Sequence, residues 1–191
     1  MAIIRMRDHL YDEIVNYAKE HLPEEACGLL AGVETGEGRE IRKVYFLENK
    51  DHAEDHFTLD PRDQINAIRD MRANGLKPLG NWHSHPSSPS RPSVEDIRLA
   101  FDSKASYLIL SLMADYPVLN SFHIEGGEWT KEDLRIYSEE CYFYRFTDRI
   151  TEAEMFEAGL FVETFLPLFI LSAYKNSVHC KSIVILVNNA S

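Results

Sequence analysis

The chain has 191 residues, of which 45% are hydrophobic and 27% are charged, and its formal net charge is −11. This composition is typical of one globular domain with a hydrophobic core, and it excludes a disordered or fibrous chain. The acidic excess disfavours nucleic acids and anionic membranes as partners, because a negative surface repels both.

The cysteine pattern gives a first indication of the compartment. Cys27, Cys141 and Cys180 are an odd number, lie far apart and form no Cys-x-x-Cys pair. This argues against a disulfide framework and against a thiolate zinc site. The first ten residues carry charges, for example at Arg5 and Asp8, and have no continuous apolar stretch, so they do not resemble a secretory signal. We therefore expect a cytoplasmic protein.

The first third of the chain shows strand and helix patterns in alternation. Ala2–Met6 is predicted as a short strand, and Asp8 opens an amphipathic helix that Pro23 ends. Two apolar segments, Ala26–Val33 and Ile41–Leu47, are separated by a glycine-containing turn. We predict that they pair as a β-hairpin.

The middle of the chain continues the alternation of helices and strands. Residues Pro61 to Gly75 are predicted as a helix with a first-turn proline. The elements predicted after it are a strand at Lys77–His85, a helix at Ser93–Phe101, strands at Tyr107–Met113 and Val118–Glu125, and a further strand at Trp129–Tyr137. Hairpins and crossovers in one chain predict an α/β fold, a mixed β-sheet sandwiched by helices.

The composition changes near residue 150. The charged residues from Met155 onward are Glu157, Glu163, Lys175 and Lys181, and their charges cancel. The whole acidic excess therefore lies in the preceding part of the chain. We predict one domain over residues 1–140 and a C-terminal extension of unknown role over residues 141–191.

The extension contains a strongly apolar segment, Gly159–Tyr174. It carries Glu163 and Pro167 and is shorter than the roughly 20 apolar residues that a membrane span needs. We predict a helix that packs on the domain or on a second copy of the chain, and a further strand at Ser182–Val187.

Two histidines stand at the end of the predicted strand Lys77–His85. Side chains two apart on a strand project from the same face, so His83 and His85 can reach one ion. A catalytic zinc ion has three protein ligands and a fourth position for water, and Asp96 follows after a proline-rich loop as a candidate third ligand. Taken alone, a His-x-His pair is more often structural.

Two further residues suit hydrolytic chemistry. Glu25 precedes an apolar strand and is a candidate general base, and the Ser93 hydroxyl could stabilise an oxyanion. Each also has a simpler interpretation. Glu25 could be a surface acid beside Glu24, and Ser93-x-x-Asp96 is also a helix capping box, a role that for Asp96 competes with metal binding.

In this order, the residues resemble the signature of the JAMM (MPN+) metalloproteases. The similar segments are Glu-Ala-Cys-Gly-Leu-Leu at 25–30 and His-Ser-His-Pro at 83–86, followed by Ser93 and Asp96. The resemblance extends over roughly residues 1–137 and includes Asn-Lys-Asp-His at 49–52. It implies a cytidine-deaminase-like fold.

The resemblance also implies a role for each of the candidate residues. It makes His83, His85 and Asp96 the ligands of Zn²⁺, Glu25 the general base and Ser93 the oxyanion donor. Some family members are inactive scaffolds that have lost ligands, so the intact set implies an enzyme.

The substrate class is implied by the resemblance alone. Family members cleave amide bonds after the Gly-Gly end of ubiquitin or ubiquitin-like proteins, or process bacterial sulfur-carrier proteins. The chain lacks room after Asp96 for the inserted segment of chain-selective deubiquitinases, which favours the compact prokaryotic type. We therefore expect a zinc-dependent peptidase or isopeptidase. The alternative is a non-catalytic module that binds a ubiquitin-like protein and holds a structural metal.

Overall fold

The computed structural model describes residues 3–138, together with the backbone of two strands at 160–165 and 168–173. The chain divides into two compact units, Met1–Tyr137 and Ser138–Ser191. The elements of the first unit are β1 (Ile3–Arg7), α1 (Asp8–Glu20), β2 (Cys27–Thr35), β3 (Gly38–Leu47), α2 (Pro61–Ala73), β4 (Lys77–His85), α3 (Val94–Leu99), β5 (Ser106–Ser111), β6 (Val118–Glu125), β7 (Glu128–Lys131) and β8 (Asp133–Tyr137).

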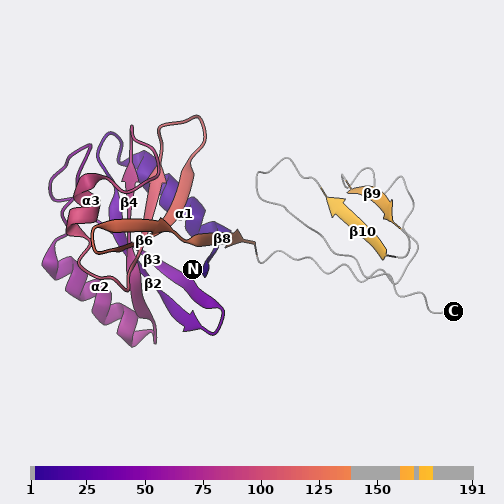
Figure 1. Ribbon diagram of the computed structural model, residues 1–191, viewed down its shortest axis with the longest axis horizontal. Helices are drawn as coiled ribbons and strands as arrows, with labels where there is room; N and C mark the ends of the chain where they lie inside the picture. The colour runs from indigo at the N-terminus through magenta and orange to yellow at the C-terminus, as the bar shows by residue number, and fades with distance from the viewer. Residues whose placement is uncertain (1–2, 139–159, 166–167, 174–191) are drawn as a thin grey trace. The chain divides into compact units, whose positions relative to one another are not determined.

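These strands form one mixed sheet in the order β7-β6-β5-β4-β2-β3-β1-β8. β4 and β5 are parallel, and β1 runs parallel to both β3 and β8. The other neighbouring pairs are antiparallel, including the predicted hairpin of β2 and β3. A mixed sheet with helices on both faces confirms the predicted α/β architecture (Figure 1).

The two faces of the sheet are covered by different helices because side chains alternate along each strand. Leu108 and Leu110 of β5 belong to the apolar cluster that contains Ile14 of α1. Ile109, between them, packs with Ile97 of α3 on the opposite face. α2 packs on β2 on the same side as α3. β5 is therefore buried on both faces, and it lies next to β4, which carries the two histidines.

The segment Trp129–Tyr137 forms two strands instead of the single one predicted. The break falls at Glu132, whose N–H donates to the Ser121 carbonyl at 2.8 Å and whose carboxylate accepts from the Ser121 hydroxyl at 2.6 Å. These bonds hold the buried Glu132 against β6, and the chain then continues as β8 beside β1. The helix at residues 94–99 is also shorter than predicted.

The prediction of a helix over Gly159–Tyr174 is wrong. The backbone forms two antiparallel strands, β9 (Leu160–Phe165) and β10 (Leu168–Ala173). Aromatic and β-branched residues, which favour strands, make up seven of its sixteen residues, and Pro167 disfavours a helix. The strand predicted at Ser182–Val187 lies outside the described residues. Among the described residues, no helix is long and apolar enough to span a membrane.

We expect the packing of α1 on the sheet to dominate the stability of the first unit. Ile14 is fully buried, whereas Ile65 on α2 is 49% exposed. Ile14→Ala should lower the free energy of unfolding by about 2–5 kcal/mol, because it removes buried surface and leaves a cavity. Urea titration monitored by tryptophan fluorescence measures this, since both tryptophans, Trp82 and Trp129, lie in this unit.

Ile65→Ala is the matched control and should cost about 1 kcal/mol or less. Equal losses for the two variants would contradict the assignment of α1 to the core.

Candidate metal centre

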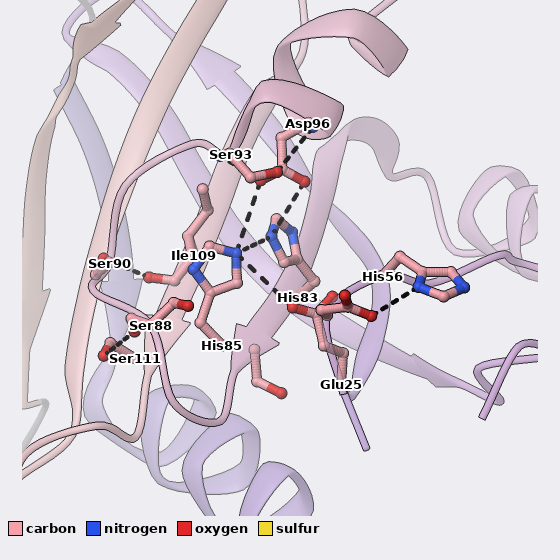
Figure 2. A network of polar contacts seen from close by, with 12 residues as sticks. Glu25, His56, His83, His85, Ser88, Ser90, Ser93, Asp96, Ile109 and Ser111 are labelled. Carbon is pink, nitrogen blue, oxygen red and sulfur yellow. Dashed lines mark hydrogen bonds and ion pairs between the residues drawn. The ribbon is translucent and has the colours of Figure 1, made fainter. Parts of the chain in front are cut away.

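His83 and His85 stand at the end of β4, and their side chains lie on the same face of the sheet. Trp82 packs in the core beneath α1, so its neighbour His83, and with it His85, projects towards the face of α2 and α3. Both histidines are buried, with 2% and 5% of their surface exposed. Their Nε2 atoms lie 3.0 Å apart, so the two rings point at a common position (Figure 2).

Asp96 reaches this position from the first turn of α3. Ser93 is the N-cap of the helix, its Oγ accepts from the Asp96 N–H at 3.1 Å, and Asp96 Oδ2 accepts from the Ser93 N–H at 2.7 Å. The same carboxylate lies 3.4 Å from His83 Nε2 and 3.7 Å from His85 Nε2. One carboxylate thus completes the capping box and faces both histidines. The two interpretations of Asp96 therefore do not exclude each other.

The three side chains fit the ligand set of a small divalent cation. Ligands about 2.0–2.1 Å from a tetrahedral zinc ion lie about 3.3–3.4 Å from each other. The separations of 3.0 Å between the two Nε2 atoms and 3.4 Å from His83 Nε2 to Asp96 Oδ1 lie around this value, and one donor atom from each residue lies within 4.8 Å of the others. Two imidazole nitrogens and a carboxylate oxygen also form a known catalytic zinc set.

The loop after β4 fixes the tautomer of His85. Its Nδ1 lies 3.0 Å from the Pro89 carbonyl, which can only accept, so Nδ1 carries a proton and, in the neutral ring, Nε2 keeps a lone pair. The hydroxyls of Ser90 and Ser111 tie this loop to β5, donating to backbone carbonyls at 2.7 and 2.6 Å (Figure 2). The prolines alone therefore do not account for the defined path of the loop.

His83 is held differently. Its ring stacks on Phe57, with the ring centroids 4.9 Å apart and an angle of 29° between the planes. Among the described residues, its Nδ1 has no hydrogen-bond partner. The orientation of His83 therefore depends on ring packing and on the strand that carries it.

Glu25 enters the site from the start of β2. Cys27 pairs with His83 in the antiparallel ladder, which directs Glu25 towards His85. Glu25 Oε1 lies 3.8 Å from His85 Nε2, and only 4% of the residue is exposed. Burial raises the pKa of Glu25 to about 8, against an opposing effect of His85. Its carboxylate is therefore a stronger base than that of an exposed glutamate.

The charges of the site are strongly coupled. Burial tends to raise the pKa of Asp96, but the contacts with His83 and His85 and the N–H of Ser93 outweigh it and hold this pKa well below its usual range. Burial tends to lower the pKa of His85, but Asp96, the Pro89 carbonyl and Glu25 raise it. The carboxylates that favour a proton on His85 also favour a metal cation at the same position.

The structure brings all five predicted site residues to the end of β4. Sequence reasoning missed the residues that support them, among which Ser84 is the most directly placed. Its buried hydroxyl accepts from the Ala26 N–H at 2.8 Å, and its own N–H donates to the Ala26 carbonyl at 2.8 Å. A hydroxyl residue between two histidines was the available signal.

Comparison with known proteins identifies the family. Residues 7–125 match the family described as prokaryotic homologues of the JAB domain. The CysO-cysteine peptidase of Mycobacterium tuberculosis (strain ATCC 25618 / H37Rv) is 30% identical over 135 residues, which cover 70% of this chain and 91% of that protein. A desampylase of Pyrococcus furiosus is 28% identical over 92 residues, covering 48% of this chain and 63% of that protein.

Solved structures agree with the sequence comparisons. The solution structure of a protein from Desulfitobacterium hafniense is 45% identical and covers 71% of this chain and 94% of that one, with a TM-score of 0.67. A protein from Salinibacter ruber is 26% identical, covers 71% of this chain and 93% of that one, and has a TM-score of 0.55. The family match and the two relatives named as enzymes confirm the predicted kinship and the hydrolytic class, and the solved structures support the fold. The chain therefore belongs to the family of prokaryotic JAB-domain homologues.

Proposed function

We propose that the chain is a zinc-dependent peptidase or isopeptidase that hydrolyses the amide bond after the Gly-Gly end of a ubiquitin-like or sulfur-carrier protein. The observation that carries this proposal is the convergence of His83, His85 and Asp96 on one position, with the buried Glu25 beside it. The substrate class is supported by the names of the relatives, a CysO-cysteine peptidase and a desampylase.

The two histidines and Asp96 hold the metal in this proposal. Zinc is favoured over other ions because two of the three donors are imidazole nitrogens, which offer the geometry of an open catalytic zinc site. When bound, the ion lowers the pKa of a water molecule and polarises the carbonyl of the substrate. The remaining steps are assigned to residues of the chain.

Glu25 moves the proton. Its carboxylate accepts the proton of the attacking water and later returns it to the leaving amine. The pKa of about 8 that burial produces suits this role, because a neighbouring cation lowers such a value towards neutrality. A base whose pKa lies near the working pH can both accept and return a proton.

Ser93 stabilises the negative charge that develops on the substrate oxygen. Its Oγ accepts from the Asp96 N–H at 3.1 Å, and a hydroxyl that accepts one hydrogen bond can still donate its own hydrogen. A donor preorganised by a helix N-terminus is suited to an oxyanion, because it needs no rearrangement during the reaction.

The domain division, the partners and the compartment are proposed from the sequence. We assign the peptidase to residues 1–140 and treat residues 141–191 as a separate extension, whose apolar segment is a candidate contact between two copies of the chain. The acidic surface disfavours nucleic acid and membranes as partners, and the cysteine pattern favours the cytoplasm.

Asp96→Asn should weaken zinc binding by at least about 100-fold. Even residues that only hydrogen-bond to a metal ligand commonly contribute about 10–100-fold to the metal affinity. The asparagine can still accept from the Ser93 N–H, so the helix cap is kept. Competition with a chromogenic chelator measures the affinity. Incubation with equal amounts of Zn²⁺, Mn²⁺ and Fe²⁺ followed by elemental analysis identifies the preferred metal.

Glu95→Gln, one residue away on the exposed side of α3, should bind zinc like the parent. If Asp96→Asn retains the parent affinity, the ligand assignment is wrong.

Glu25→Gln should lower kcat by about 10²–10⁴-fold, the contribution of a general base, without changing the zinc content. The assay uses a carrier domain that ends in Gly-Gly and is joined to a second protein through a peptide or lysine isopeptide bond. Cleavage is followed by mass spectrometry of the zinc-loaded parent and variant.

The control for this experiment is Glu24→Gln, which changes the neighbouring, more exposed carboxylate and should leave the rate near that of the parent. A Glu25→Gln variant that cleaves as fast as the parent would rule out the mechanism.

A further inference from the structure

The loop between β3 and α2, residues 48–60, contains none of the five site residues, yet it contacts two of them, Glu25 and His83. The Ala53 carbonyl accepts from the Glu25 N–H at 2.8 Å. The Phe57 ring stacks on His83. This β3–α2 loop therefore touches both the proposed base and one proposed metal ligand.

Asn49 lies at the centre of the β3–α2 loop and is 6% exposed. Its Nδ2 donates to the Glu25 carbonyl at 3.1 Å and to the His56 carbonyl at 3.0 Å. Its Oδ1 accepts from the N–H groups of Asp51 and Thr58 at 3.1 and 3.3 Å. The acceptor half of the amide thus closes the loop on itself, and the donor half both binds the loop at His56 and joins it to Glu25.

These contacts hold the Glu25 backbone on both sides. The N–H of Glu25 is bound by Ala53 and its carbonyl by Asn49. The ladder between β2 and β4 begins only at Cys27 and His83, so the sheet does not clamp Glu25 directly. β4 holds the next residue, Ala26, through Ser84, and the β3–α2 loop holds the peptide groups of Glu25 itself.

We propose that Asn49 is a positioning residue that holds the general base over the metal centre. This inference rests on the proposed function of Glu25. An asparagine that only closed its own loop would need the bonds to His56, Asp51 and Thr58 but not a bond to Glu25. The bond to the Glu25 carbonyl spans 24 residues of sequence and joins two different segments. A misplaced catalytic group loses much of its effect, because the reaction depends on the alignment of the reacting atoms.

Asn49→Ala should lower kcat by about 10–100-fold, the usual contribution of a group that orients a site residue, while KM and zinc content stay near those of the parent. The metal ligands come from β4 and α3, and the supports of His85 and Asp96 lie outside the loop, so the zinc content also reports whether Phe57 still packs on His83. Asn49→Asp retains the acceptor and loses the donor, so it should show a similar loss of kcat. If both variants keep the parent kcat, the proposal is overturned.

The matched control is Gln64→Ala. The Gln64 Nε2 donates to the Leu59 carbonyl at 3.1 Å, so this side chain ties the end of the same loop without touching Glu25. Its removal should leave kcat near that of the parent. An equal loss in Gln64→Ala would show that general loosening of the loop, and not the link to Glu25, controls the rate.

A double-mutant cycle tests whether Asn49 acts through Glu25. In the Glu25→Gln background there is no carboxylate to position, so Asn49→Ala should produce no further loss of kcat. A loss as large as in the parent background would mean that Asn49 acts independently of the base, and would overturn the proposal.

Amide hydrogen exchange supplies a readout that needs no substrate. In Asn49→Ala, the Glu25 N–H should exchange about tenfold faster than in the parent, as expected when a supporting hydrogen bond is lost. The Ser84 N–H, bound to the Ala26 carbonyl, should keep its rate. If the exchange rate of the Glu25 N–H is unchanged in Asn49→Ala, the proposed positioning role of Asn49 is overturned even if the parent is active. If the parent is inactive but Asn49→Ala still shows the faster exchange, the proposed function is refuted and the link between Asn49 and Glu25 is supported.

Discussion

Antiparallel pairing of β2 with β4 sets Cys27 opposite His83, and the rest of the site depends on this register. A slip of one residue would turn both histidines to the face beneath α1, where Trp82 packs. Close packing opposes such a slip. A β-carbon added to Gly28 would lie 1.8 Å from the Tyr45 carbonyl oxygen, which also accepts from the Trp82 indole N–H at 3.2 Å. The register is thus held by the core as well as by the ladder.

The burial of the Asp96 and Glu25 carboxylates at the end of β4 is not explained by fold stability. A carboxylate removed from water is costly unless it is paired, hydrogen-bonded or bound to a metal, and apolar residues of similar size would usually be as stable. Asp96 is compensated by Ser93 and the histidines, whereas burial leaves Glu25 with a pKa of about 8. Perturbed groups that converge in this way are typical of functional sites.

Local patterns predicted most of the elements. The strands Lys77–His85 and Val118–Glu125 have the predicted bounds, because apolar runs between turn residues mark a strand clearly. The position of β8 beside β1 was not predictable, since it depends on contacts between the two ends of the domain. The apolar segment 159–174 was misassigned because periodicity does not separate a buried helix from buried strands.

For the site, too, local sequence patterns reveal some residues, whereas others are revealed only by contacts between distant segments. His83, His85 and Asp96 can be recognised by their type and spacing, whereas Asn49 is an ordinary loop asparagine until the fold places it against Glu25. The supports of His85 and of Glu25 also come from different parts of the chain, whereas His83 shares the β3–α2 loop with Glu25 through the stacking of Phe57. β5 and the loop after β4 hold His85, while the β3–α2 loop holds Glu25. If the proposed roles are correct, changes around His85 should therefore affect metal affinity more than proton transfer, and changes around Asn49 should do the opposite.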